Sequence, residues 1–251
     1  MNRFNGQVLL LSPHIDDVPF SLGAALLDRR FSAAEVVNVF SISRSANNDD
    51  DVERVTTARR NEDEQFFRTI RSSVTRHYLD RLDAPLRLSI TDDDVYRVTP
   101  SMRASAEVTY IRSALDVIRP ERTALLVAPL ALGTHVDHVV THHAACDAAR
   151  DGWQVAFYED LPYASDVTLQ GIQDAAEKTA AEVGVHLAPL VLHWSGAGSS
   201  KLKAIACYAS QMGPTTLSRV HEHATRLGFA ERLWCDARAI TKSASGQPIT
   251  S

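Results

Sequence analysis

Short apolar segments alternate with helix-forming segments along most of this 251-residue chain, and this alternation restricts its fold more than any other feature. We expect strands at residues 7–11, 36–42, 74–79, 124–128 and 153–158, and helices at 18–30, 52–70, 104–118 and 138–150. Strands that are separated by helices usually form a mostly parallel sheet with helices on both faces. The sequence therefore predicts an α/β fold.

The same pattern continues in the second half of the chain. Helices are expected at 168–183, 200–211 and 216–227, with an apolar segment at 187–194 and a strand-like segment at 232–240. No internal repeat or Pro/Gly-rich linker marks a boundary, and α/β folds of this length often form one unit. We expect a single domain at residues 1–240, followed at 241–251 by a flexible tail that lacks apolar anchors.

Charge and cysteine content indicate the class of protein. The net charge of −5 and the pI near 6.0 argue against a nucleic-acid partner, which usually requires a basic surface. Cys146, Cys207 and Cys235 are odd in number and widely spaced, as is typical of reduced thiols. The apolar run at 8–11 is too short for a signal peptide or a membrane span. We expect a cytoplasmic protein with no membrane partner.

An imidazole and two carboxylates follow the first expected strand directly, in the segment Ser12-Pro13-His14-Ile15-Asp16-Asp17. Open α/β sheets bind ligands at the carboxyl ends of their strands. A dinucleotide-binding fold needs a Gly-rich turn at this position, but the first glycine after the strand is Gly23, inside the expected helix. The segment therefore indicates a polar site that does not bind a nicotinamide cofactor.

A second polar segment completes a possible metal site. His14 and Asp17 are close enough in sequence to bind one cation, and a nitrogen–oxygen ligand pair suits zinc or another borderline divalent metal. Residues 133–138, Gly-Thr-His-Val-Asp-His, follow the expected strand at 124–128 and offer a third ligand at the same edge of the sheet. Three protein ligands and a water would form an open, catalytic zinc site.

Together, the two segments resemble the PIG-L or LmbE-like N-deacetylases, which deacetylate glucosaminyl lipids and glycosides. That family has Pro-His-x-Asp-Asp after its first strand and a distal His-x-Asp-His, matched here by residues 13–17 and 135–138. Weaker similarities extend the resemblance over most of the chain, at residues 59–62, 83–87, 158–163, 203–205, 208 and 211. The resemblance implies a single-domain, Rossmann-like α/β fold with a mostly parallel sheet and helices on both faces.

The resemblance also implies how one zinc ion is bound and used. It makes His14, Asp17 and His138 the zinc ligands and Asp16 the general base for the zinc-bound water. An amide is a poor electrophile, so its hydrolysis at neutral pH needs a strong nucleophile and a Lewis acid. Zinc can supply both, because it lowers the pKa of bound water to about 7 and polarises the carbonyl group.

The remaining matched residues would act on the substrate. The resemblance makes His135, held by Asp137, the group that stabilises the oxyanion or protonates the leaving amine, and it places Arg59 and Asp83 in the substrate pocket. Family members commonly have a glutamate after the aspartate pair, where this chain has Val18. We expect this difference to affect the substrate more than the metal site.

Less specific interpretations explain parts of the pattern. Asp16 and Asp17 could simply charge a helix N-terminus, although this would not explain the second motif. His138 and His142 are four residues apart and form a rival metal pair, without the glutamate that a zinc-protease helix carries after its first histidine. Asp160 could orient a metal-binding imidazole. His142 and His143 are expected to pack in the core or to support the metal ligands. The other histidines are expected to be structural or surface residues: His77, His186, His193, His221 and His223.

The sequence thus predicts a zinc-dependent hydrolase that removes an N-acyl group, most simply acetyl, from a small polar molecule such as an N-acetyl amino sugar or a glycoside. Because the metal chemistry does not itself select the leaving group, hydrolysis of another amide, a cyclic amide or an ester is an alternative. An inactive metal-binding interaction domain is a third hypothesis, but it would not need Asp16 and His135. A homo-oligomer is compatible with the sequence.

Overall fold

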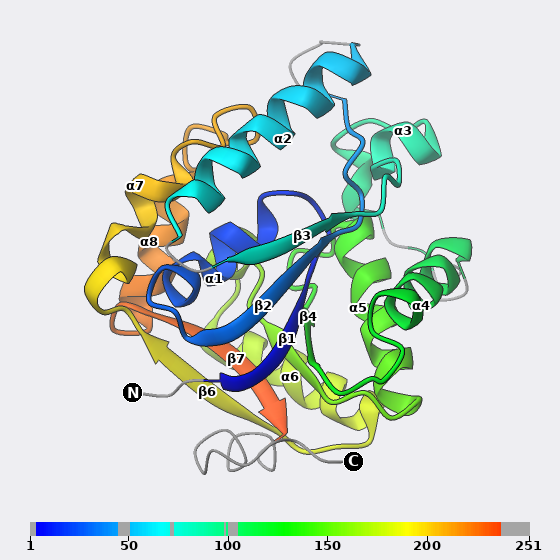
Figure 1. The fold of residues 1–251 in the computed structure, drawn as a ribbon, viewed down its shortest axis with the longest axis vertical. Helices are drawn as coiled ribbons and strands as arrows, with labels where there is room; N and C mark the ends of the chain where they lie inside the picture. The colour runs from blue at the N-terminus through cyan, green and yellow to red at the C-terminus, as the bar shows by residue number, and fades with distance from the viewer. Residues whose placement is uncertain (1–3, 45–50, 71–72, 98, 100–104, 237–251) are drawn as a thin grey trace.

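The computed structural model describes residues 4–44, 51–70, 73–97, 99 and 105–236 (Figure 1). In this part of the chain, one sheet has the strand order β3-β2-β1-β4-β5-β7-β6. The strands are β1 (Phe4–Ser12), β2 (Phe31–Asn38), β3 (Val74–Tyr78), β4 (Leu125–Pro129), β5 (Val155–Tyr158), β6 (Leu187–His193) and β7 (Ala230–Asp236). The expected tail at 241–251 and the end of the last expected strand, at 237–240, lie outside the described residues.

The first five strands are parallel, as predicted. β1 pairs with β2 on one side and with β4 on the other, and Leu10 is aligned with Val36 and Val127. β7 is antiparallel to both β5 and β6. The direction in which strands are added reverses between β1 and β4, so a crevice is expected there at the carboxyl ends of the strands.

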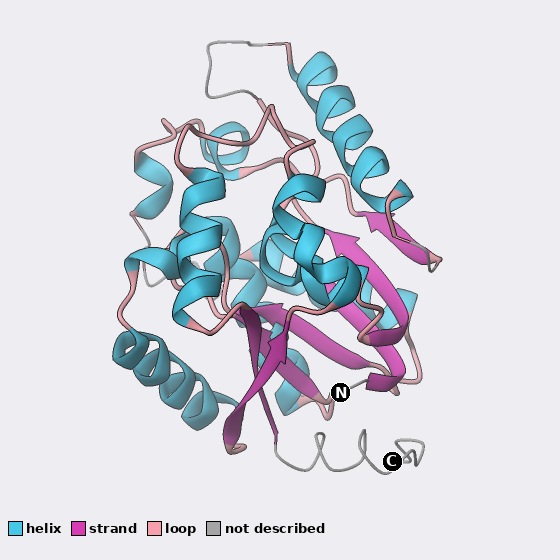
Figure 2. Cartoon of the chain, turned by 90° about the vertical axis from the view of Figure 1, so that its left-hand side faces the viewer, coloured by secondary structure: helices cyan, strands magenta, loops and turns pink. Residues whose placement is uncertain are grey.

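Helices cover both faces of this sheet. One face carries α1 (Asp17–Leu27), α7 (Lys201–Ile205) and α8 (Thr216–Arg226), and the other carries α4 (Ala106–Ile118), α5 (Val136–Arg150) and α6 (Leu169–Val183) (Figure 1). Figure 2, seen from the side of α7 and α8, shows helices in front of the strands. The remaining helical segments are α2 (Val52–Arg68), α3 (Ala84–Leu88), η1 (Asp94–Tyr96), η3 (Tyr163–Asp166) and η4 (Gly196–Ser200).

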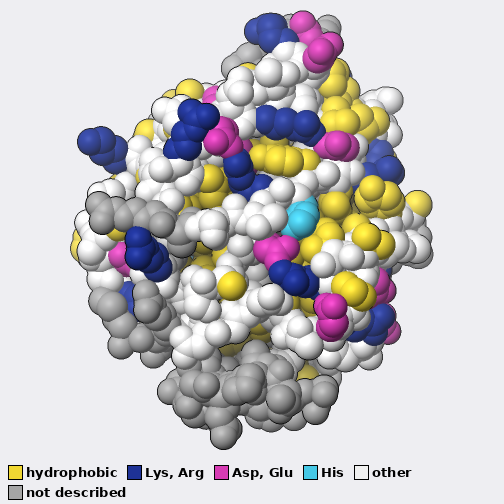
Figure 3. Space-filling model, in the orientation of Figure 1, with side chains coloured by type: hydrophobic (Ala, Val, Ile, Leu, Met, Phe, Trp, Pro, Cys, Tyr) yellow, Lys and Arg dark blue, Asp and Glu magenta, His cyan; other side chains and the backbone are white. Residues whose placement is uncertain are grey.

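The central strand explains the apolar run near the N-terminus. Leu9, Leu10 and Leu11 of β1 are completely buried, because helices pack on both faces of the strand. Among the described residues, no helix combines the length and the apolar character needed to cross a membrane. On the face seen in Figure 3, basic and acidic side chains are interspersed among hydrophobic ones.

Two expected elements differ from the observed ones. The strand expected at 36–42 ends at Asn38, because the chain then curls over the β1–α1 loop: Val39 and Phe40 donate backbone N–H groups to the carbonyls of Ser12 and Pro13, each at 2.9 Å. The apolar residues 39–40 are therefore buried in a loop that supports the strand end.

The helix expected at 200–211 is helical only in α7, Lys201–Ile205. Beyond it, the hydroxyl of Tyr208 donates to Asp63 of α2 (3.0 Å), and Ser210 donates its backbone N–H to Glu62 (2.7 Å). These side-chain bonds hold residues 206–212 against α2 in an irregular conformation, which local helix propensity could not reveal.

Candidate active site

The β1–α1 loop holds polar side chains at the carboxyl end of the central strand. The hydroxyl of Ser12 donates to the carbonyl of His14 (2.5 Å) and accepts the backbone N–H of Val18 (3.1 Å), so it fastens both ends of the turn. α1 begins at Asp17, and the side chain of Asp16 at the N-cap makes no hydrogen bond to the helix backbone. The Asp16 carboxylate is therefore not used as a helix cap.

The β4–α5 loop brings the second motif to the same edge of the sheet, because β4 lies beside β1. Ala131 (φ 62°) and Thr134 (φ 56°) have left-handed backbone conformations, which cost about 1–3 kcal/mol each for ordinary residues and are common at functional sites. The sharp turn places His135 at the N-cap of α5, where its Nδ1 accepts the backbone N–H of Asp137 (3.2 Å).

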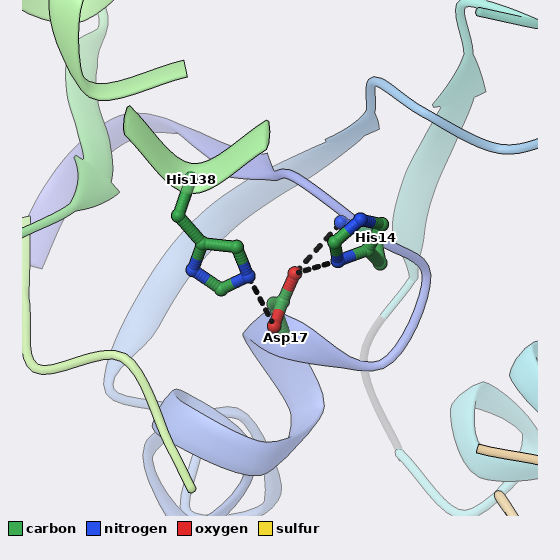
Figure 4. A group of neighbouring side chains, drawn as sticks. All are labelled: His14, Asp17 and His138. Carbon is green, nitrogen blue, oxygen red and sulfur yellow. Dashed lines mark hydrogen bonds and ion pairs between the residues drawn. The ribbon is translucent and has the colours of Figure 1, made fainter. Parts of the chain in front are cut away.

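His14, Asp17 and His138 converge as the candidate metal centre (Figure 4). Nδ1 of His14 lies 3.2 Å from one carboxylate oxygen of Asp17, and Nε2 of His138 lies 3.2 Å from the other. One ligand atom from each residue lies within 4.8 Å of the other two. The two motifs, far apart in sequence, thus meet in one nitrogen–oxygen donor set of the kind that binds zinc.

The environment of His138 fits a bound cation. Its Nδ1 lies 3.0 Å from Oδ2 of Asp160. Because an ionised carboxylate only accepts, Nδ1 carries the proton in the neutral ring, and Nε2 presents a lone pair to Asp17. This Nε2 is buried and faces the Asp17 carboxylate oxygen, which is also an acceptor, at 3.2 Å. Burial alone would lower the pKa of His138, but Asp17 and Asp160 raise it to about 9, so the surroundings favour positive charge at this point.

Asp160 positions His138, as the sequence suggested. Its second oxygen, Oδ1, accepts the backbone N–H of Leu132 (3.0 Å) from the β4–α5 loop. Asp160 is completely buried, directly after β5. A carboxylate that fixes the ring of a metal-binding histidine in this way is a common feature of zinc sites.

Asp137 contacts two histidines of the site, His135 as expected and also His14. Its Oδ2 lies 3.0 Å from Nε2 of His14 and accepts the backbone N–H of Ala84 (2.9 Å), while Oδ1 accepts from Arg87 (2.6 Å). Only the backbone of Asp137 bonds to His135. Asp137 therefore holds the His135 ring through its backbone N–H, while its carboxylate is enclosed between the β1–α1 loop and α3 and holds His14.

Asp16 and His135 lie in environments that shift their proton affinities in opposite directions. Burial and the carboxylate of Asp17 raise the pKa of Asp16 to about 7. Burial and the nearby His14 lower the pKa of His135 to about 3, so its imidazole is neutral near neutral pH. Since its Nδ1 accepts a backbone N–H, the proton of the neutral ring is on Nε2. His135 is therefore arranged as a hydrogen-bond donor.

A cavity of about 190 Å³ opens beside these residues. Arg59 and Asp83 line this cavity, and the buried Nε of Arg59 has no hydrogen-bond partner among the described residues. Asp83 also caps α3, where Oδ1 accepts the backbone N–H of Leu86 (3.2 Å). The other lining residues are His14, Asp16, Arg44, Pro85, Asp92, Val95, Tyr96, His135, Tyr163 and Gln211. The cavity thus combines charges of both signs with aromatic walls.

Comparison with known proteins agrees with this geometry. Residues 9–149 match the PIG-L family, described as GlcNAc-PI de-N-acetylase. A 2'-N-acetylparomamine deacetylase of Streptomyces fradiae is 30% identical over 254 residues, which cover 96% of this chain and 86% of that protein. The chain belongs to the PIG-L family. It is accordingly a hydrolase of the N-deacetylase class.

Solved structures of other deacetylases share the fold. A deacetylase of the teicoplanin biosynthesis pathway matches with a TM-score of 0.66 and 25% sequence identity. The match covers 91% of this chain and 97% of that deacetylase. A zinc-inhibited form of a teicoplanin deacetylase has a TM-score of 0.65 and 24% identity, with the same coverage. The Rossmann-like α/β architecture of the PIG-L chain is thereby confirmed.

The rival metal pair of this PIG-L chain does not form. His142 turns away from His138. Its Nδ1 lies 2.9 Å from the carbonyl oxygen of Pro129, and its Nε2 lies 3.4 Å from Sγ of Cys146. Val18, at the position where the family commonly has glutamate, is completely buried. Among the residues that line the described cavity are none of the histidines expected to be structural or surface residues, His77, His186, His193, His221 and His223, nor His142 and His143.

Sequence reasoning missed several residues around the site. Arg87 binds Asp137 and lies 4.5 Å from the ring of Phe40, and it belongs to a segment already noted for its weak family similarity. Tyr163 of a second such segment and Tyr96 of η1 both line the cavity and pack edge to face, with ring centroids 6.1 Å apart. The surroundings of Tyr96 carry no comparable motif, so its position could come only from the fold.

Proposed function

We propose that this protein is a zinc-dependent N-deacetylase that removes the acetyl group from an amino sugar unit of a small polar glycoside or pseudosaccharide. The observation that carries the proposal is the donor set of His14, Asp17 and His138, in which only His14 is partly exposed and which adjoins a polar cavity lined by Asp16 and His135. The similarity to a 2'-N-acetylparomamine deacetylase supports an aminoglycoside-like substrate.

In this proposal, His14, Asp17 and His138 hold one zinc ion, with Asp137 and Asp160 positioning the two imidazoles. When bound, zinc supplies Lewis-acid polarisation of the substrate carbonyl and lowers the pKa of water. The protein's own groups accept and return the proton and bind the carbonyl oxygen.

Asp16 accepts the proton of the attacking water, because its carboxylate faces the cavity and is not used as a helix cap. His135 donates a hydrogen bond from Nε2–H to the carbonyl oxygen as negative charge develops there. After the C–N bond breaks, the proton held on Asp16 is available to the departing amine. Carboxylate and imidazole thus act on opposite ends of the reacting amide.

The cavity volume limits what is bound. At about 190 Å³ it lies below the roughly 300–1,000 Å³ typical of pockets that enclose drug-sized ligands. It therefore holds one sugar unit with its acetamido group, while the rest of the substrate extends outward. Arg59 and Asp83 offer a donor and an acceptor for the hydroxyl or amino groups of that unit.

The experiment is a primary-amine release assay over a panel of N-acetylated amino sugars and N-acetylated pseudosaccharides. We expect amine and acetate in equal amounts, loss of activity after chelation, and recovery on adding substoichiometric zinc or cobalt. Full activity in protein shown by elemental analysis to be metal-free would refute the proposal. Hydrolysis of ester analogues but of none of the amides would refute N-deacetylation.

A further inference from the structure

A second group of potential metal ligands lies one turn further along α5 from His138. It consists of His142 and Cys146 on α5 and Glu182 on α6, with one ligand atom from each within 4.8 Å of the others. His142 and Cys146 are buried and Glu182 is partly exposed, so the group can be reached from the α5–α6 edge. The proposed deacetylation uses none of these side chains.

We propose that His142, Cys146 and Glu182 bind a second metal ion, zinc or a similar borderline divalent cation, which links α5 to α6. Zinc lies about 2.0–2.1 Å from nitrogen and about 2.3 Å from sulfur in tetrahedral sites, which places nitrogen and sulfur about 3.5 Å apart. The observed distance between Nε2 of His142 and Sγ of Cys146 is 3.4 Å. This pair therefore already has the spacing of two ligands on one ion.

The orientation of His142 is that of a metal ligand. Its Nδ1 lies 2.9 Å from the carbonyl of Pro129, at the end of β4. A carbonyl oxygen only accepts, so Nδ1 carries the proton and the Nε2 lone pair faces Cys146. Metal-binding histidines usually donate their second N–H to a carbonyl or carboxylate in this way. The fold thus presents His142 in the correct tautomer.

Glu182 supplies the hard ligand and balances the charge. Arg150 donates to its Oε1 at 3.2 Å, and Nδ1 of His143 lies 3.5 Å from the same oxygen, so the carboxylate is held at the mouth of the cluster. On metal binding, the thiol of Cys146 loses its proton to solvent, and thiolate plus carboxylate neutralise a divalent cation. A neutral complex suits this mostly buried position.

Sulfur distinguishes this site from the active site, whose ligands are nitrogen and oxygen. Titration of the full-length, metal-free protein with cobalt(II) should produce a near-ultraviolet thiolate-to-cobalt charge-transfer band. We expect the band to disappear in Cys146→Ser and to remain in Cys207→Ser, the matched change at a half-buried thiol elsewhere. It should also remain in His14→Ala, which removes an active-site ligand only.

Glu182→Gln provides a second test at a partly exposed position, where the substitution leaves the core intact. We expect its cobalt dissociation constant, read from the same band, to rise at least tenfold. No sulfur band in the folded wild-type protein, a band that survives in Cys146→Ser, or an unchanged dissociation constant in Glu182→Gln would each overturn the proposal. Because the readout is independent of deacetylation, these outcomes do not bear on the proposed function.

Discussion

At the scale of single residues, two adjacent aspartates have different surroundings although they are chemically alike. Both oxygens of Asp17 face imidazole nitrogens, those of His14 and His138, and the side chain is buried. Asp16 instead lines the cavity and makes no capping bond. Consecutive side chains at the start of a helix point in different directions, so one can bind the metal while the other faces the substrate.

This difference predicts distinct effects of the same substitution. Asp17→Asn should weaken zinc binding, because a neutral amide oxygen is a poorer ligand. Asp16→Asn should keep its zinc and lose about 10²–10⁴-fold in kcat, because it removes the proton acceptor. Metal content and turnover are measured for both variants in a Cys146→Ser background, so that only the active site titrates. The reverse pattern would exchange the two roles.

Asp160 is a positioning residue whose substitution should act through His138. Asp160→Asn should lower zinc affinity by about 10–100-fold, because the amide no longer fixes the ring and its tautomer. The readout is the zinc dissociation constant from competition with a chelator, again in the Cys146→Ser background. Asp174→Asn is the matched control on the exposed surface of α6. Equal affinity in both variants would show that Asp160 does not orient the ligand.

At the scale of elements, the β4–α5 loop depends on close contact with η3. A Cβ added at Gly133 would lie 2.3 Å from Cγ of Tyr163, far inside contact distance. In α1, by contrast, a Cβ added at Gly23 would meet its nearest atoms in Lys201 and Ile205 at 3.5 and 3.6 Å, ordinary packing distances. The two glycines therefore differ in whether the fold requires them.

Alanine substitutions should separate these glycines. Gly133→Ala should destabilise the protein by about 1–3 kcal/mol and raise KM, because Tyr163 must leave the cavity wall. Gly23→Ala should leave activity unchanged and stabilise the protein by about 0.5–1 kcal/mol, since alanine restricts the unfolded chain and favours helix. Urea unfolding and steady-state kinetics measure both effects. Wild-type stability and KM in Gly133→Ala would contradict the close contact seen here.

At the scale of the whole molecule, a buried ion pair of the C-terminal part of the fold is hydrogen-bonded to α1 near the N-terminus. Nζ of Lys201 on α7 lies 2.7 Å from Oε1 of Glu231 on β7, and both side chains are fully buried. Glu231 also accepts the backbone N–H groups of Ala24 and Ala25 at 2.8 Å each, beyond the non-helical residue Leu22 of α1. The Glu231 carboxylate thus accepts two backbone N–H groups of the kinked helix and balances the positive charge of Lys201.

Removing the lysine should leave this carboxylate buried without its counter-charge. Lys201→Met should lower the free energy of unfolding by about 3–5 kcal/mol at neutral pH. Burial already raises the pKa of Glu231, and the variant should raise it further. At low pH the Glu231 carboxyl group is uncharged in both the folded and the unfolded protein. The loss of unfolding free energy in the variant should therefore shrink as pH falls, and it should grow as pH rises above the ordinary pKa range of glutamate.

Chemical unfolding of Lys201→Met at several pH values, with Lys203→Met as the exposed matched control on α7, tests this dependence. The control should unfold like the wild-type protein at every pH. A destabilisation of Lys201→Met that does not vary with pH would mean that lost packing, rather than an uncompensated carboxylate, is responsible.

The α/β class, the parallel arrangement of the first five strands and the meeting of the two motifs can be predicted from the sequence alone. Alternating periodicity predicts such sheets, and neighbouring parallel strands end at one edge, so the convergence of His14, Asp17 and His138 follows from the sequence pattern. These features follow from local pattern and from general topological rules, which need no knowledge of individual side-chain contacts.

Which groups hold the side chains of the site depends on contacts between segments far apart in sequence. The Asp137 carboxylate binds His14, 123 residues away, and Arg87, 50 residues away, rather than the neighbouring His135. Residues 206–212 leave the helix because Asp63 and Glu62 of α2 bind them across 145 and 148 residues. The physical reason is the same in each case: side-chain bonds between distant segments outweigh local preference, and they exist only once the sheet has brought those segments together.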